Sequence, residues 1–284
     1  MRNRPGAKAL TYSLWAVLLL GPLLVACSDD ASPETSSTST PGVTTTTVLT
    51  DTSSIEPPPE DQTTSSTQST DDTATPNAII QPGFIEWEPI DFGDASAYLV
   101  IRDDLAALVD VGPASGVADI EKVLTTHGLG WANVIQVVLT HGHSDVAGGV
   151  EEVMRRAPHI AVAASSPTVT ELGISATAQE VSDGVLVFGL QVVATPGHTP
   201  GHLSYFEPVG GILFAGDAIR GGDAAGQERG DVVGPDPGST DDADRAAGSI
   251  AILAGLDVET ILFSHGAPVE DDARTKLIDL ANRT

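Results

Sequence analysis

The sequence has little cysteine, few cations and few aromatic residues, and each shortage excludes a class of protein. One cysteine in 284 residues excludes an intrachain disulfide framework and a Cys-rich zinc knuckle. The 13 Lys and Arg residues face 39 Asp and Glu residues, and this formal net charge of −26 disfavours binding to phosphate backbones, which takes clustered cations. Aromatic residues, at 4%, are too scarce for a base-stacking surface. We therefore expect no nucleic-acid partner.

The N-terminal hydrophobic run is too short to span a bilayer comfortably, and it has the features of a secretory signal. A basic stretch at residues 2–8 precedes an apolar run over residues 14–26. The run ends in Leu-Val-Ala-Cys, which resembles a bacterial lipobox, and the resemblance implies cleavage before Cys27 and lipidation of its thiol, as by palmitate. We therefore expect residues 1–26 to be a signal peptide, and a lipid anchor to hold the mature protein at the cell membrane, facing the extracellular or periplasmic side. The alternatives are an uncleaved anchor helix and an ordinary signal with a chance cysteine.

The segment 28–80 lacks the composition of a folded domain. Thr, Ser and Pro make up 27 of the 40 residues from 31 to 70, and no Lys or Arg occurs between Cys27 and Arg102. Such a segment buries too little apolar area to offset the entropy of ordering. We expect a disordered linker that spaces the next domain from the membrane, whether or not it is also glycosylated.

The remaining segment, 81–284, mixes strand and helix patterns, and the chain length allows one or two globular units. Its apolar, β-rich runs are at 97–101, 106–111, 134–139, 160–163, 185–188, 192–194, 203–206, 212–214 and 260–263, and its helical patterns cover 117–126, 147–156, 241–256 and 271–282. This mixture predicts an α/β domain whose sheets are covered by helices. The helix-free run of strands between 185 and 214 predicts hairpins.

Five of the seven histidines follow directly after strand-like runs: His141, His143, His198, His202 and His265. Asp145 and Asp217 lie in similar places. Ligands of α/β folds bind outside the carboxyl ends of strands, and imidazole nitrogens with carboxylate oxygens suit zinc or iron. The pattern therefore predicts a metal site. His127 and His159 lack this setting, and we expect both at the surface.

Five segments then resemble motifs of the metallo-β-lactamase fold superfamily. Thr140–Gly149 is similar to its Thr-His-x-His-x-Asp-His-x-Gly-Gly loop, and Gly197–His202 to its second histidine motif. The others are Phe214–Asp217, which looks like its bridging-aspartate segment, Ser264–Gly266, which looks like its last ligand, and Ala107–Gly112, which looks like its early Asp-x-Gly strand. The four ligand motifs stand in the family's order, and the resemblance covers about residues 97–268.

The resemblance implies a fold and a ligand set. The fold is an αββα sandwich of two mixed β-sheets flanked by helices, with metals in a groove at one edge. The first metal is held by residues matching His141, His143 and His198, and the second by residues matching Asp145, His265 and the bridging Asp217. His202 and Asp110 are expected to support these ligands without binding metal. The alternatives are a purely structural turn residue, which is an equally good reading of His202, and a strand-end residue that caps the turn, which is at least as good a reading of Asp110.

One departure from the family pattern concerns the second metal. Val146 stands where many members have a histidine that binds it. The subclass of β-lactamases that uses a cysteine ligand also lacks this histidine and still binds the second zinc with three protein ligands. Here Asp217 would take the place of that cysteine. We therefore expect one tight Zn²⁺ and a second, weaker one.

The resemblance implies a hydrolase that uses a metal-bound hydroxide on a small ester, thioester, lactone or lactam, with Asp145 as the residue that orients or deprotonates the water. Two alternatives remain open, a mononuclear Fe²⁺ enzyme that oxidises a persulfide and a non-catalytic metal-binding module. The Gly- and Asp-rich stretch at 218–240 either forms a wall of the substrate groove or is a flexible surface insertion. The sequence does not indicate the natural substrate or the oligomeric state.

Overall fold

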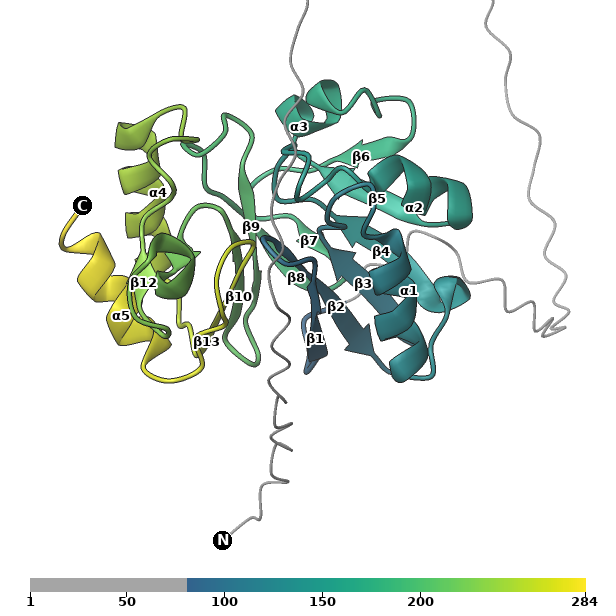
Figure 1. Ribbon diagram of the computed structural model, residues 1–284, viewed down its shortest axis with the longest axis horizontal. Helices are drawn as coiled ribbons and strands as arrows, with labels where there is room; N and C mark the ends of the chain where they lie inside the picture. The colour runs from purple at the N-terminus through teal and green to yellow at the C-terminus, as the bar shows by residue number, and fades with distance from the viewer. Residues whose placement is uncertain (1–80) are drawn as a thin grey trace, which may run out of the picture. The chain divides into compact units, whose positions relative to one another are not determined.

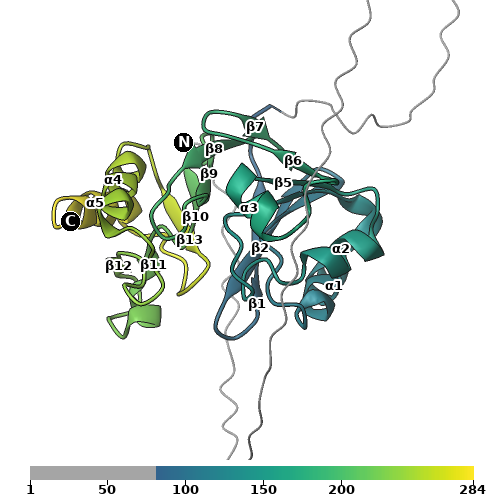
Figure 2. The ribbon, with the colours of Figure 1, turned by 90° about the horizontal axis from the view of Figure 1, so that it is seen from above.

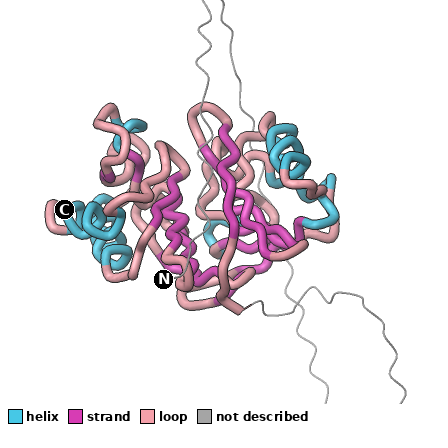
Figure 3. The backbone as a smooth tube through the Cα atoms, turned by 90° about the horizontal axis from the view of Figure 1, so that it is seen from below, coloured by secondary structure: helices cyan, strands magenta, loops and turns pink. Residues whose placement is uncertain are grey.

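The computed structural model describes residues 81–284, so the expected signal peptide, Cys27 and the linker lie outside the described residues. In the described part, two β-sheets lie against each other and helices cover their outer faces (Figure 1). The view from above shows α1, α2 and α3 on one flank and α4 and α5 on the other (Figure 2), and the view from below shows helices on both flanks of the strands (Figure 3). No helix of this part is long and apolar enough to cross a membrane.

The first sheet has six strands in the order β1-β2-β3-β4-β5-β6. The strands from β1 to β3 run antiparallel, and β3 to β6 are parallel neighbours. Helices and turns connect the parallel strands, as such crossovers require. The bounds are β1 (Glu86–Asp91), β2 (Ser96–Arg102), β3 (Leu105–Val109), α1 (Val117–Thr126), the 3₁₀-helix η1 (Trp131–Asn133), β4 (Val134–Val138), α2 (Val150–Arg156), β5 (Ala161–Ala164), α3 (Ser166–Glu171) and β6 (Ala178–Glu180).

The second sheet has five strands in the order β13-β10-β9-β8-β7. The strands from β7 to β10 form the antiparallel hairpins predicted for this region, and β13 joins β10 in parallel after the crossover helix α4. A separate two-stranded sheet pairs β11 with β12. The bounds are β7 (Leu186–Val187), β8 (Leu190–Ala194), β9 (Leu203–Glu207), β10 (Ile212–Gly216), β11 (Arg220–Gly221), η2 (Gly222–Ala225), β12 (Val232–Val233), α4 (Ala243–Ala254), β13 (Thr260–Phe263) and α5 (Ala273–Ala281).

The continuous apolar runs of the strands produce three buried layers. In β2, Leu99 packs in the layer beneath α1 and α2, whereas its neighbour Tyr98 packs between the two sheets. In β10, Phe214 packs between the sheets and Leu213 packs beneath α4 and α5. Because successive side chains of a strand point to opposite faces, both sheets are buried on both faces. The domain is thus the mixed α/β sandwich that the resemblance implied, and this prediction is confirmed.

The strand and helix patterns missed the shortest elements and one edge strand. Helix α3 has six residues, and it begins where the Ser165 side chain accepts a hydrogen bond from the Thr168 backbone N–H. Strand β1 contains Pro89, which an edge strand tolerates because one side of its backbone needs no partner strand. An element as short as α3 carries too few residues for a period to be read, whereas in β1 the proline interrupts the strand pattern.

Candidate metal centre

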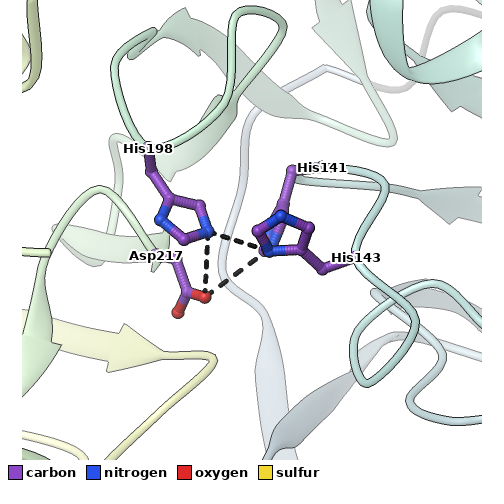
Figure 4. Close-up of side chains that lie close together, drawn as sticks. All are labelled: His141, His143, His198 and Asp217. Carbon is purple, nitrogen blue, oxygen red and sulfur yellow. Dashed lines mark hydrogen bonds and ion pairs between the residues drawn. The ribbon is translucent and has the colours of Figure 1, made fainter. Parts of the chain in front are cut away.

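Four of the predicted ligands follow three strands of the two sheets and converge at one edge of the sandwich. His141 and His143 come after β4, His198 after β8, and Asp217 directly after β10. Figure 4 shows these four side chains turned toward a common point. Each offers one ligand atom, and these atoms all lie within 4.8 Å of one another. Residues up to 76 positions apart in the sequence therefore share one small volume.

The donor set and its spacing suit a divalent cation. The Nε2 atom of His198 lies 3.1 Å from Nδ1 of His143, and Oδ2 of Asp217 lies 3.4 Å from the same Nε2. Nε2 of His141 is 3.6 Å from Asp217 Oδ2, is fully buried, and has no hydrogen-bond partner among the described residues. A buried polar atom without a partner is costly unless something binds it. Three imidazole nitrogens and a carboxylate oxygen are ligands typical of zinc.

A hydrogen-bond chain from Asp110 determines which nitrogen of His141 faces the cluster. The carboxylate of Asp110 accepts hydrogen bonds from the Thr140 backbone N–H (2.8 Å) and hydroxyl (2.9 Å). Because the Thr140 hydroxyl donates to Asp110, it must accept from His141 Nδ1, 3.0 Å away. His141 then carries its proton on Nδ1, and the Nε2 lone pair is free for a metal. Burial raises the pKa of Asp110 to about 7.

His202 supports Asp217 through a second chain of this kind. Its Nε2 accepts a hydrogen bond of 2.9 Å from the Asp217 backbone N–H, so its proton is on Nδ1, which lies 2.9 Å from the Thr195 hydroxyl. Thr195 lies 2.9 Å from Ser204, which donates to the Ala215 carbonyl oxygen. Burial lowers the pKa of His202 to about 3, so the ring is neutral. The structure places His202 and Asp110 beside the ligands, as expected, while their roles remain predictions.

The other oxygen of Asp217 faces a second set of candidate ligands, which is more exposed to solvent than the first. Oδ1 of Asp217 lies 2.8 Å from Nδ1 of His265, whose Nε2 is 3.1 Å from Oδ2 of Asp145. The Asp145 side chain is 48% exposed, whereas that of His141 is 0% exposed. The hydrogen bond to Asp217 raises the pKa of His265. Val146 is buried and offers no ligand atom, so this group supplies three protein ligands at most.

Asp217 and the histidines of the cluster shift one another's pKa values. Although burial raises the pKa of Asp217, the hydrogen bond from His265 and the nearby histidines lower it overall, so the carboxylate is ionised. Burial lowers the pKa of both His141 and His198, which leaves neutral rings. Neutral imidazole and ionised carboxylate are the protonation states in which these side chains bind metals. His127 and His159 are exposed, as expected.

Two buried tyrosines, which were not predicted from the sequence, hold the ligand loops across the sandwich. Tyr98 in the first sheet donates to the carbonyl oxygen of Phe263 (2.7 Å), two residues before His265. Tyr205 in the second sheet donates to the carbonyl oxygen of Leu139 (2.8 Å), two residues before His141. Each sheet thus fixes a strand end of the other. The only signal in the sequence is that tyrosine stands within an apolar strand, and its hydroxyl needs a partner when buried.

Gly216 gives a direct test of how tightly this edge is built. It has φ of +60°, and a Cβ there would lie 2.6 Å from His202 Nε2 and 2.9 Å from Thr140 Cβ. We expect Gly216→Ala to destabilise the domain by roughly 3 kcal/mol or more, because left-handed backbone strain adds to a clash in a close-packed region. Urea unfolding measures the effect. Gly128→Ala is the control, since Gly128 has φ of +70° with nothing within 4 Å. Equal losses for both variants would contradict the tight arrangement.

Comparisons with known proteins agree with this geometry. The profile of the metallo-beta-lactamase superfamily matches residues 90–265. The probable metallo-hydrolase YflN of Bacillus subtilis (strain 168) is 32% identical over 216 residues, covering 62% of this chain and 81% of that protein.

Two solved structures share the fold. A metallo-beta-lactamase of Cronobacter sakazakii with a HARLDQ motif superposes with a TM-score of 0.55 at 16% identity, covering 72% of this chain and 93% of that one. A metallo-beta-lactamase from Erythrobacter litoralis superposes with a TM-score of 0.52 at 22% identity, covering 70% and 92%. From its fold, the profile match and the metallo-hydrolase relative, this chain belongs to the metallo-beta-lactamase superfamily.

Proposed function

We propose that the protein is a zinc-dependent hydrolase of small, uncharged or cationic esters, thioesters, lactones or lactams. The observation that carries the proposal is the cluster of His141, His143, His198 and Asp217, in which a buried Nε2 has no partner. Membership of the superfamily supports a metal-dependent hydrolase in general. The location expected from the lipobox, at the outer side of the membrane on a lipid at Cys27, is part of the same proposal.

The chemistry divides between the metal and the side chains around it. Zinc bound by such ligands lowers the pKa of water to about 7 and polarises a carbonyl oxygen. His141, His143 and His198 would hold the first ion, and Asp217, Asp145 and His265 the second. Asp145 is the open carboxylate beside this cluster, and it accepts the proton of the attacking water at Oδ2 and later passes it to the leaving group. Asp217 keeps the two ligand groups together through its two oxygens.

The charges around the cluster favour substrates without a negative charge. Glu171 at the end of α3 places its carboxylate against Gly142, between two ligand histidines, where a Cβ would lie 2.3 Å from Oε2. On the other side, the Asp241 backbone N–H donates to the His198 carbonyl oxygen, and the Asp241 charge acts on the His198 ring. The neighbouring cation Arg220 is engaged, with its guanidinium 3.6 Å from Asp236. A substrate carboxylate that does not itself bind the metal would meet repulsion from Glu171 and Asp241.

A substrate panel on the zinc-loaded protein tests the proposal. A chromogenic ester, thioester, lactone and lactam are each assayed before and after removal of the metal with a chelator, and again after zinc is restored. We expect turnover of at least one class, at least 100-fold loss on chelation, recovery with zinc, and a lower kcat/KM for a substrate that carries a carboxylate. Zinc binding without turnover of any class would favour the binding module, and recovery with Fe²⁺ but not zinc would favour the iron enzyme.

A further inference from the structure

The chain between Asp217 and α4 also forms hydrogen bonds to the loops that carry two other predicted ligands, His265 and His198. We call residues 218–242 the cross-connection; it begins beside Asp217, contains β11, η2 and β12, and ends at Asp242, whose side chain caps α4 by accepting from the Arg245 backbone N–H. The sequence suggested either a wall of the substrate groove or a flexible insertion here. The hydrogen bonds of this segment point to a different role, since they end on the ligand loops themselves.

One end of the cross-connection holds the loop of His265. The Gly221 backbone N–H donates to the carbonyl oxygen of His265 (2.9 Å), and Asp223 Oδ1 accepts from the Ala267 backbone N–H (3.0 Å). Between these bonds, Gly266 has φ of +105°, and a Cβ there would lie 2.6 Å from the Gly221 Cα. The backbone on both sides of this glycine is therefore tied to η2 and β11. His265 is restrained before any ion binds.

The other end of the cross-connection holds the loop of His198. The Asp241 backbone N–H donates to the His198 carbonyl oxygen (3.2 Å), and the Asp242 backbone N–H donates to the Gly197 carbonyl oxygen (2.9 Å). In between, Arg220 Nε donates to the carbonyl oxygen of Gly234 (3.3 Å), which closes the segment on itself. One stretch of chain thus joins the loops of three predicted ligands that come from three strands.

We propose that Asp223 is a positioning residue for His265, and that the cross-connection sets the affinity of the second metal site. This inference rests on the two-metal site of the proposed function. That site has three protein ligands at most, because Val146 offers none, so each ligand must be held well. A ligand restrained in advance loses less entropy on binding, and partners of metal ligands commonly change metal affinity by 10–100-fold. Asp223 supplies the only side-chain bond to the Ala267 N–H among the described residues.

Metal affinity in four variants of the full chain tests this role without an activity assay. The metal-free protein is titrated with Co²⁺, whose absorption distinguishes the two sites, and with Zn²⁺ in competition with a chromogenic chelator. We expect Asp223→Ala to weaken the second site about 10-fold and leave the first unchanged; this is the low end of the range for groups that bond a metal ligand directly, because Asp223 bonds the backbone two residues after His265. Asp223→Asn should bind as the wild type does, since its amide oxygen accepts the same hydrogen bond. Glu228→Ala, at an exposed carboxylate of the same segment, is the control.

Asp223→Glu separates the position of the accepting oxygen from the negative charge of the side chain. The same variant tests the inference if the alanine variant does not fold. It keeps the negative charge but displaces the accepting oxygen, so we expect a weaker second site. Wild-type affinity in Asp223→Glu together with weak binding in Asp223→Asn would mean that charge alone acts, and would overturn the inference. Unchanged affinity in Asp223→Ala would also overturn it while leaving the proposed function intact. A wild-type protein that binds only one metal would instead overturn the two-metal site itself.

Discussion

Replacing His141 by alanine is expected to lower kcat/KM by about 1,000-fold or more and to remove the tightly bound metal. The Nε2 atom of His141 is fully buried, and the chain from Asp110 through Thr140 fixes its lone pair toward the cluster. Loss of one of three imidazole ligands leaves too few strong donors for a zinc site, and the chemistry that zinc supplies is lost with it. Steady-state kinetics and metal content of the same preparation measure both effects.

The control for this variant is His127→Ala. His127 is exposed at the end of α1, and its Nε2 lies 3.6 Å from a Glu88 oxygen, an interaction that contributes little at a surface. We expect its kinetics and metal content to match those of the wild type. If His141→Ala kept its metal and its activity, the cluster would not be the metal site, even though its geometry fits one.

The second large effect is expected from Asp145→Asn, which should lower kcat by about 100- to 10,000-fold. The amide cannot accept the proton of the attacking water, and it is a poorer metal ligand than a carboxylate. Because Asp145 stands apart from the three-histidine cluster, on the open side of His265, the first metal should remain bound. The variant therefore separates binding of the first metal from the two roles of Asp145, which are proton transfer and binding of the second metal.

The measurement is kcat together with the number of bound metals per chain, with Asp94→Asn as the control. Asp94 is exposed, and we expect its substitution to change neither quantity. A wild-type kcat in Asp145→Asn would refute the assignment of the proton acceptor. Loss of both metals together would show that Asp145 serves the first site too, contrary to the arrangement of the side chains.

The sequence predicts well which side chains come together, because the candidate ligands lie in short motifs at strand ends. His141 and His143 follow an apolar strand by a few residues, and the structure places both in the cluster with His198. The layered fold was also predictable, because β2 and β10 are continuous apolar runs, which are typical of strands buried on both faces. Both predictions use information confined to a few neighbouring residues.

The supporting interactions were not predictable in this way. The partners of Tyr98 and Tyr205 lie 165 and 66 residues away in the sequence, and only the packing of the two sheets against each other brings them together. The role of Asp223 depends on a bond to a backbone N–H 44 residues later, in a Gly- and Asp-rich segment without periodicity. A motif identifies a ligand, but what holds the ligand in place depends on the tertiary fold.

The most direct test of the account is elemental analysis of the full-length protein purified without chelators. We expect one to two zinc ions per chain, with the second removed first by a weak chelator, because its ligands are more exposed and include one imidazole instead of three. One iron per chain would contradict the zinc assignment and favour persulfide oxidation. A protein that holds no metal, even after incubation with zinc, would contradict the central claim that the three histidines and Asp217 form a metal site.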